Sequence, residues 1–287
     1  MAEIAGEDPI PPEGLDLSKP SVARIYDYML GGTANWAIDR TFGDKLVEAF
    51  PLAKPMVLAN RLFLHRAVRY LVRQGVRQFV DVGSGVPTVG NTHQVADEVS
   101  PDTRVVYIDH EPVAVAHSTI LLEQHGDPSR HAVINADLRC PEHLWEKVAE
   151  TGKINFDEPI GLLLVAVLHF AQPGPDGTDV GPRSVAKLRE LLPTGSYLAM
   201  SHACNEGLPE QTTAILQRLK ASYDSAVTGV NWRTVAEFRD LFGDFELVEP
   251  GIVWTDLWHP EESGPNAPVA DAVPGGSAIR AGVARKV

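Results

Sequence analysis

The chain has few cysteines and no long apolar stretch, and both shortages exclude classes of protein. Its 287 residues include two cysteines, Cys140 and Cys204, too few for a disulfide scaffold or a cysteine-rich zinc site. No apolar run approaches the roughly 20 residues that a membrane-spanning helix needs, and the longest, residues 160–168, suits a buried strand. The acidic, proline-containing start is unlike a signal peptide. We therefore expect a cytoplasmic protein without a membrane segment.

The chain is also short of positive charge. Lysine and arginine total 25 against 38 aspartates and glutamates, which gives a net charge of −13. Because so acidic a chain repels a phosphate backbone, we expect no nucleic-acid partner. The densest basic stretch, residues 61–77, falls in a predicted helix, and we interpret its arginines as a solvated helix face. The histidines show no metal-ligand spacing, so no metal site is predicted.

Hydrophobic periodicity divides the chain into a helical beginning and a longer part in which strands and helices alternate. Residues 1–17 form a predicted flexible tail, and the pattern from residue 18 to residue 76 is helical. Apolar runs separated by helix-length segments then indicate a parallel sheet with helices on both faces. The predicted parallel strands are 78–82, 104–108, 132–135, 160–168 and 197–201. Two further strands, 245–253 and 277–285, have no helix between them and should pair antiparallel, and residues 260–276 form a predicted loop.

Two glycines follow the first of these strands. The segment FVDVGSG at residues 79–85 ends a hydrophobic strand in Gly-x-Gly, which lets a ligand approach the backbone closely. The dinucleotide pattern requires a third glycine where Thr88 stands, and Pro87 removes a backbone donor. The pattern therefore argues against a dinucleotide and leaves two alternatives, a nucleoside without phosphates or a tight strand-to-helix turn alone.

Acidic residues follow the next two strands. Asp109 ends the second strand, where folds of this type bind both ribose hydroxyls. Asp137, with Leu138 beside it, follows the third strand and can accept a hydrogen bond from the exocyclic amine of a purine. Each aspartate can instead cap the helix that follows it. Together with the glycine turn, the two carboxylates favour a nucleoside site.

In this order and spacing, the glycine turn, the acidic strand end and the Ala-Asp-Leu at 136–138 resemble a class I S-adenosylmethionine-dependent methyltransferase. A more specific likeness lies in ARIYDYMLGG at residues 23–32, supported by Asn60-Arg61 and by AVLH at 166–169. With these segments, residues 18–286 resemble a bacterial, largely actinobacterial family of S-adenosyl methyltransferases, formerly a domain of unknown function.

This resemblance implies an α/β fold with a Rossmann-like, seven-stranded sheet whose last strand inserts antiparallel beside the fifth. It also implies a helical cap at residues 18–76 and a methyltransferase core at residues 77–287. The implied cofactor is S-adenosylmethionine. Its implied binding residues are Asp81, Gly83, Ser84 and Gly85 for the methionine part, Asp109 and His110 for the ribose, Asp137 and Leu138 for the adenine, and Ala166 beside the sulfonium.

For methyl transfer to a small-molecule acceptor, His169 is the candidate base. It follows the central strand, and an unperturbed histidine titrates near neutrality; a histidine that fixes the loop through backbone bonds is the alternative. The helical cap is expected to fold over the site, and aromatic residues that serve only the core are the alternative. The predicted lid residues are Tyr26, Tyr28, Asn35 and Trp36.

The loop after the central strand departs from the family. Residues 170–173 read Phe-Ala-Gln-Pro, where many relatives have a second histidine and an acidic residue. This difference motivates an alternative function, a non-catalytic sensor or regulatory module that binds S-adenosylmethionine or its demethylated product. Side chains such as Phe170 and Trp36 that fill the acceptor space would favour that alternative. If the protein is an enzyme, a small metabolite of secondary metabolism is the first expectation for its acceptor, and the oligomeric state is not predicted.

Overall fold

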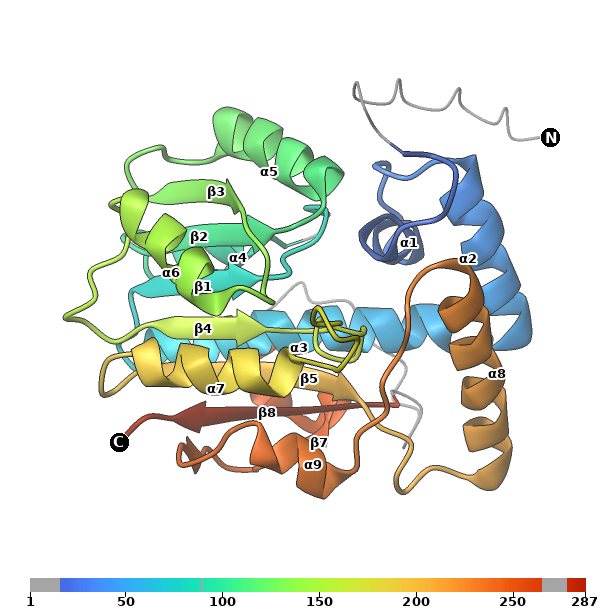
Figure 1. Cartoon of the computed structure of the whole chain (residues 1–287). Helices are drawn as coiled ribbons and strands as arrows, with labels where there is room; N and C mark the ends of the chain where they lie inside the picture. The colour runs from blue at the N-terminus through green and yellow to red at the C-terminus, as the bar shows by residue number, and fades with distance from the viewer. Residues whose placement is uncertain (1–15, 89, 265–277) are drawn as a thin grey trace.

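A mixed sheet forms the centre of the molecule, with helices on both of its faces (Figure 1). The computed structural model describes residues 16–88, 90–264 and 278–287. The strand order is β3-β2-β1-β4-β5-β8-β6, with β7 also paired to β8. The strands are β1 (Gln78–Val82), β2 (Arg104–Asp109), β3 (His131–Asn135), β4 (Gly161–Leu164), β5 (Tyr197–Ala203), β6 (Glu246–Leu247), β7 (Val253–Trp254) and β8 (Ile279–Arg285).

Strands β1 to β5 are parallel, whereas β8 runs antiparallel to β5. The short strands β6 and β7 also pair antiparallel with β8. The prediction of a last strand inserted antiparallel beside the fifth is therefore confirmed, and so is the α/β fold class.

Helices cover both faces of the sheet. On one face α6, α7 and α9 pack against the strands, and on the other face α3 and α4 do so. The helices are α1 (Val22–Met29), α2 (Ala37–Ala49), α3 (Ala53–Arg73), α4 (Thr92–Asp97), α5 (Pro112–His125), α6 (Pro141–Glu150), α7 (Gly181–Leu191), α8 (Glu210–Ala226) and α9 (Val235–Asp240), with short 3-10 turns η1 (Thr255–Leu257) and η2 (Pro260–Glu262).

A separate apolar cluster holds a cap at the carboxyl ends of the parallel strands. Its buried residues include Ile25 and Met29 of α1, Leu46 of α2 and Leu216 of α8. An edge-to-face contact between Phe42 and Tyr223 also joins α2 to α8, with ring centroids 5.2 Å apart. The cap is thus built from two distant parts of the sequence, and Figure 1 shows α8 beside α2. The first part was predicted from the sequence, whereas the contribution of α8 was not.

Two predicted strands differ from the structure, and one helix was not predicted. The predicted strand at 160–168 ends at Leu164, and the predicted strand at 245–253 is replaced by the two short strands β6 and β7. Helix α4 follows the glycine turn and was not predicted. The predicted tail at 1–17 and the loop at 260–276 lie largely outside the described residues.

The interpretation of the basic stretch as a solvated face of α3 is wrong for its first four members, whereas Arg73 at the end of α3 is exposed. Arg61, His65, Arg66 and Arg69 are all buried. Arg66 donates one hydrogen bond to the carbonyl oxygen of Trp258, at 2.7 Å, and another to the carbonyl oxygen of Thr255, the first residue of η1. Part of this basic side of the helix is therefore covered by the chain that follows β7. Within the described ranges, no helix is long and apolar enough to cross a membrane.

Candidate functional site

A cavity of about 770 Å³ lies between the cap and the carboxyl ends of β1, β2 and β4. This is where open parallel sheets bind ligands, and the volume falls within the roughly 300–1,000 Å³ typical of small-molecule sites. Figure 1 shows the arrowheads of these strands pointing towards the cap. The cavity is lined mainly by residues 19–24, 83–86, 109–113, 165–167 and 170–173.

The turn after β1 brings backbone to the cavity. Gly83 and Gly85 both have positive φ angles, +69° and +67°, which L-residues with a side chain rarely adopt. A Cβ on Gly83 would lie 2.6 Å from Cγ2 of Val167, whereas a Cβ on Gly85 would meet nothing within 4 Å. The turn is therefore packed tightly against the segment after β4 at Gly83 and is open at Gly85.

This difference predicts unequal costs for two alanine substitutions. Gly85→Ala should lower the free energy of unfolding by about 1–2 kcal/mol, the cost of the left-handed backbone alone. Gly83→Ala should cost about 1–3 kcal/mol more, because it also overpacks Val167. Urea unfolding of the two variants measures both values. Equal losses would contradict the close contact with Val167.

Asp109 joins the glycine turn to the start of α5. Its Oδ2 accepts a hydrogen bond from the Gly85 N–H at 2.8 Å, and its Oδ1 accepts one from the Glu111 N–H at 2.8 Å. The residue is buried yet lines the cavity, and a carboxylate has further lone pairs for a ligand. His110 lines the same part of the cavity with an exposed ring. The structure thus brings together the glycines and the acidic end of β2.

Asp81 lies deeper in the cavity wall. Its Oδ2 accepts a hydrogen bond from the Thr92 hydroxyl at 2.6 Å, which ties the end of β1 to the first residue of α4. Burial raises the pKa of Asp81 to about 6, while the nearby positive charge of Arg61 opposes that rise. At neutral pH the carboxylate is therefore still largely ionised.

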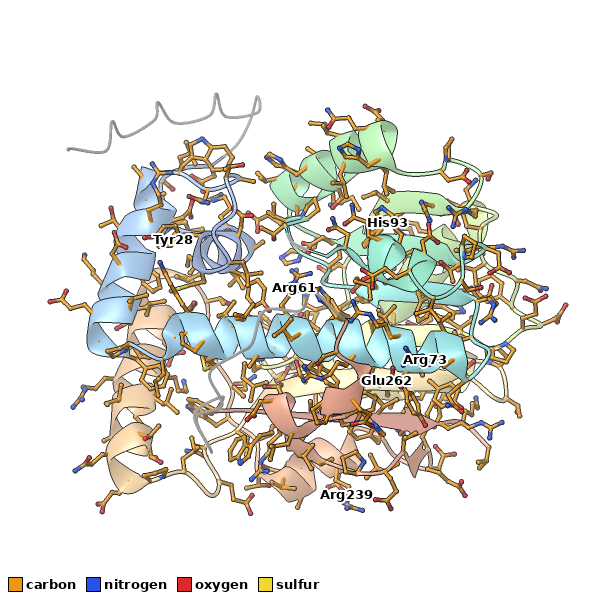
Figure 2. The ribbon with its side chains drawn as sticks, turned by 180° about the vertical axis from the view of Figure 1, so that it is seen from behind. Tyr28, Arg61, Arg73, His93, Arg239 and Glu262 are labelled. Carbon is orange, nitrogen blue, oxygen red and sulfur yellow. The ribbon has the colours of Figure 1, made fainter. Side chains whose placement is uncertain are left out.

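Arg61 reaches the cavity from the middle of α3, between the cap and the sheet (Figure 2). The side chain is buried and lies over the ring of Tyr26, with 5.6 Å from the guanidinium carbon to the ring centroid. Its Nε has no hydrogen-bond partner, and no carboxylate among the described residues forms an ion pair with it. Asp81 is near enough for its charge to interact with Arg61 but forms no ion pair with it, so the buried guanidinium retains hydrogen-bonding capacity that suits a ligand carboxylate.

The two residues predicted to bind adenine are placed away from the described cavity lining. Asp137 forms an ion pair with Arg139, and Leu138 is buried in the core around α6. Neither is among the described residues that line the cavity, whereas Arg139 is. Arg139 was not predicted, because no pattern around it distinguishes it from a surface arginine.

Ala166 lines the cavity in an unusual conformation. Its φ is +59°, a left-handed value that costs a residue other than glycine about 1–3 kcal/mol and is often found at functional sites. The Ala166 N–H donates a hydrogen bond to the Ser201 hydroxyl of β5 at 2.9 Å. The strand therefore ends in a turn that the neighbouring strand holds in place.

His169 does not lie at the cavity wall. It is buried beside Phe170 and His202, with ring centroids 4.4 Å and 5.8 Å away, and its Nδ1 has no hydrogen-bond partner among the described residues. Burial lowers the pKa of His169 to about 3. The ring is thus neutral and lies against Phe170, outside the described cavity lining, and this geometry does not support its predicted role as a base.

The neutral buried His169 predicts a loss of stability in acid. In the unfolded chain its pKa is close to 6.5, so between that pH and about 3 the unfolded state binds more protons. The free energy of unfolding should therefore fall as the pH drops below about 6.5. His169→Leu should remove about 2 kcal/mol of the difference between pH 7 and pH 5, measured by urea unfolding. His143→Leu, on an exposed part of α6, is the matched control; equal pH dependence in both variants would contradict the prediction.

Of the four predicted lid residues, Tyr26 lines the cavity. Tyr28 donates a hydrogen bond to Asp44 within the cap, and the Asn35 amide donates one to Asp27 at 2.8 Å. Trp36, the residue directly before α2, is buried, and the guanidinium carbon of Arg24 lies 5.7 Å from its ring centroid. These three stabilise the cap and lie outside the described cavity lining.

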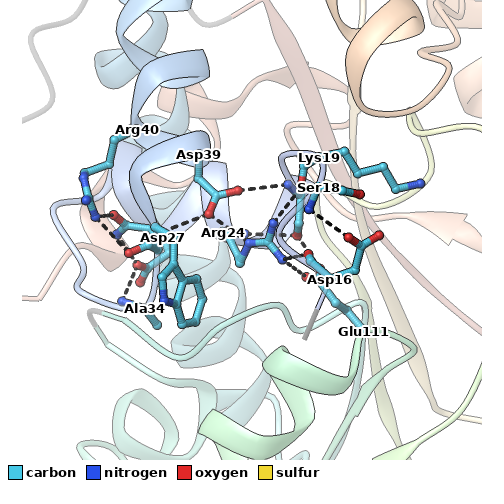
Figure 3. Close-up of polar contacts among 12 residues, drawn as sticks. Asp16, Ser18, Lys19, Arg24, Asp27, Ala34, Asp39, Arg40 and Glu111 are labelled. Atoms are coloured by element: carbon cyan, nitrogen blue, oxygen red, sulfur yellow. Dashed lines mark hydrogen bonds and ion pairs between the residues drawn. The ribbon is translucent and has the colours of Figure 1, made fainter. Parts of the chain in front are cut away.

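Polar contacts tie the cap to the core at the cavity (Figure 3). The Ser21 hydroxyl donates a hydrogen bond to Glu111 at 2.5 Å, and Arg24 forms ion pairs with Asp39 at 2.9 Å and with Glu111 at 3.5 Å. Glu111 is two residues beyond Asp109. The cap is thus held directly beside the acidic end of β2, and Arg24, unlike Arg61, already has carboxylate partners.

The far part of the cavity is bounded by the segment after β4 and the end of α8. The Ala171 N–H donates a hydrogen bond to the Gly229 carbonyl at 2.7 Å, which joins these two segments. Phe170, Gln172, Val227 and Thr228 line the space there. Phe170 lines the cavity without closing it, and Trp36 is not part of the described lining, so the filled acceptor space expected of a sensor is not observed.

Comparison with known proteins gives consistent matches. The sequence profile of a family described as S-adenosyl methyltransferase matches residues 9–287. A crystal structure from Thermobifida fusca YX, provisionally described as a methyltransferase, is 40% identical with a TM-score of 0.82, covering 96% of this chain and 98% of that one. A DUF574 family protein from Streptomyces avermitilis is 34% identical with a TM-score of 0.80, covering 94% and 98%. Magnesium protoporphyrin IX methyltransferase from Synechocystis, solved with bound S-adenosylhomocysteine, shares the fold at 14% identity and a TM-score of 0.50, covering 82% and 86%. A search of the curated proteins finds no match.

The sheet order, the cavity at its carboxyl edge and these matches define a class I methyltransferase that uses S-adenosylmethionine. Within that class, the chain belongs to the S-adenosyl methyltransferase family. The resemblance seen in the sequence is thereby confirmed, as are the enzyme class and the cofactor.

Proposed function

We propose that the protein transfers the methyl group of S-adenosylmethionine to a small molecule that binds between the cap and the segment after β4. The observation that carries this proposal is the single cavity that extends from the glycine turn, past Ala166, to Phe170 and Thr228. One end has the groups that suit the cofactor, and the other end has space for an acceptor. The size of the cavity favours a metabolite over a macromolecule.

The proposed cofactor contacts follow from the chemistry of the lining. Asp109 accepts hydrogen bonds from the ribose hydroxyls, and the backbone of Gly83, Ser84 and Gly85 allows close approach. Arg61 binds the carboxylate of the methionine part, and the ionised Asp81 binds its amino group. An adenine ring has apolar surface beyond Asp109 on the first turn of α5, with His110 beside it. Contacts of adenine with Asp137 and Leu138 stay a prediction.

In this mechanism the protein positions the acceptor and excludes water. The bound cofactor supplies an activated methyl group on sulfur, ready for in-line displacement. Phe170, Val227 and the cap enclose the acceptor, while Gln172 and Thr228 can hydrogen-bond its polar groups. Phe170, Gln172, Val227 and Thr228 have no titratable side chain, and Asp81 lies at the cofactor end of the cavity. We therefore expect an acceptor whose nucleophile needs no protein base, such as an acidic phenol or an amine already in its free form.

Titration calorimetry with S-adenosylhomocysteine tests the cofactor part of the proposal, and a cocrystal with the same molecule tests the acceptor part. We expect one site per chain, with the homocysteine carboxylate at Arg61 and open space from the sulfur towards Phe170. Binding with the sulfur facing a closed wall would overturn the acceptor site and leave the cofactor site intact. A cytoplasmic location and a role in secondary metabolism stay predictions.

A further inference from the structure

A chain of hydrogen bonds that is fully buried at its middle, between Ser201 and Asn60, connects the cap to the cavity wall. The Ala166 N–H donates to Ser201 at 2.9 Å, and the Ser201 hydroxyl donates to Oδ1 of Asn60 at 2.6 Å. The Asn60 amide donates to the Tyr26 hydroxyl at 3.0 Å, which donates to the Val57 carbonyl at 3.3 Å. Both Ser201 and Asn60 are completely buried. Helices α1 and α3, strand β5 and the segment after β4 therefore meet through these bonds, whose middle members Ser201 and Asn60 are closed to water, while the partly buried Tyr26 borders the cavity.

The donor and acceptor roles along this chain are fixed from one end. A backbone N–H can only donate, so the Ser201 oxygen accepts from Ala166 and its hydrogen is left for Asn60. The amide oxygen of Asn60 must then face Ser201, and its NH₂ must face Tyr26. The last carbonyl, that of Val57, accepts from Tyr26. A reversal of any one group would leave a buried polar atom unpaired, which couples the members of the chain.

The position of Ser201 explains why the chain acts on Ala166. Strands β4 and β5 pair up to Leu164 and Met200, and Ser201 is the next residue of β5. The segment after Leu164 leaves the sheet and turns through the left-handed backbone of Ala166. The Ser201 hydroxyl thus takes the place of the missing backbone pairing. In the same turn, Val167 packs against Gly83.

We propose that Tyr26, Asn60 and Ser201 are positioning residues that couple the placement of α1 to the turn at Ala166. When the cap is seated, the chain is complete and the wall beside the methyl-transfer region is held in its left-handed conformation. When α1 moves away, the Asn60 amide loses its acceptor and the turn is released. This proposal does not depend on the identity of the acceptor, because all its contacts lie within the protein.

Hydrogen exchange of the Ala166 amide, followed by NMR in the unliganded protein, tests this coupling. Tyr26→Phe removes the hydroxyl at the cap end and keeps the ring, and we expect the Ala166 amide to exchange at least fivefold faster although Tyr26 does not bond to it. Tyr28→Phe is the matched control, since it deletes a hydroxyl of the same helix that bonds to Asp44 instead. Equal exchange rates at Ala166 in the two variants would overturn the proposal.

A double-mutant cycle on S-adenosylhomocysteine affinity provides a second readout. Tyr26→Phe and Ser201→Ala should each weaken binding about three- to tenfold. The double variant should bind S-adenosylhomocysteine no less tightly than the single variant with the lower affinity, because one broken hydrogen bond already releases the turn. Ser201→Thr keeps the hydroxyl and should restore most of the affinity lost in Ser201→Ala. If the affinity losses of the two single variants multiplied in the double variant, or if Ser201→Thr restored no affinity, the residues would have independent structural roles. Either result would contradict the coupling.

Discussion

Asp109→Asn is expected to weaken the binding of S-adenosylhomocysteine by at least about 100-fold. Both carboxylate oxygens of Asp109 accept backbone N–H groups, from Gly85 and from Glu111, in addition to facing the cavity. An asparagine must turn its NH₂ towards one of these two donors, so the loop and the start of α5 lose their shared acceptor. The same change removes the negative charge that strengthens hydrogen bonds from two ribose hydroxyls. Bonds to charged groups contribute about 1.5–3 kcal/mol each, and a 100-fold change is about 2.7 kcal/mol.

Titration calorimetry of the variant measures this effect, and urea unfolding of the unliganded variant measures how much of it comes from the loop. Asp102→Asn is the control, because Asp102 is an exposed carboxylate in the turn that precedes β2. We expect wild-type affinity from the control and a loss of about 1–3 kcal/mol of unfolding free energy from Asp109→Asn. If Asp109→Asn bound the ligand as tightly as wild type, the ribose assignment would be wrong.

The sequence was sufficient for the features that depend on local signals. The glycine turn and Asp109 each directly follow a strongly apolar strand, and parallel strands place their carboxyl ends together. The antiparallel last strand was predicted because no helix separates it from the preceding strand segments. In these cases the residues that determine the structure are close together in the sequence.

Features that depend on distant parts of the chain could not be predicted in this way. Residues 160–168 are apolar throughout, so nothing local shows that β4 ends at Leu164; the end depends on Ala166 and its bond to Ser201. His169 was consequently placed at a strand end that does not exist. Likewise, Arg66 is buried because the segment after β7, about 190 residues later in the chain, covers it.

The contribution of α8 to the cap could not be predicted for the same reason. Its buried Leu216 packs into a cluster made mostly by α1, α2 and α3, and this contact cannot be read from either segment alone. One consequence concerns the acceptor: Val227 and Thr228, just beyond α8, line the cavity beside Phe170. The sequence therefore indicated the cofactor end of the cavity much better than the acceptor end, which is assembled from segments far apart in the chain.

Arg61→Met is expected to separate two ligands that differ only in the amino-acid part. S-adenosylhomocysteine has a carboxylate and methylthioadenosine has none, while both have the same adenosine. Because Arg61 is buried in the cavity wall without an anionic partner, its replacement should weaken the first ligand by at least 30-fold, about 2 kcal/mol, and leave the second within about twofold. Methionine approximates the length of the arginine stem, so the packing over Tyr26 is largely retained.

Arg139→Met is the matched control, since Arg139 also lines the cavity but is already paired with Asp137. Its replacement should change the affinity of the two ligands by the same factor. Equal losses of both ligands in Arg61→Met would mean that Arg61 shapes the cavity without binding the carboxylate. Unchanged affinity for both would place the carboxylate elsewhere. The preferential loss of S-adenosylhomocysteine is expected because a buried guanidinium that forms no ion pair within the protein gains most from the one ligand that brings a carboxylate to it.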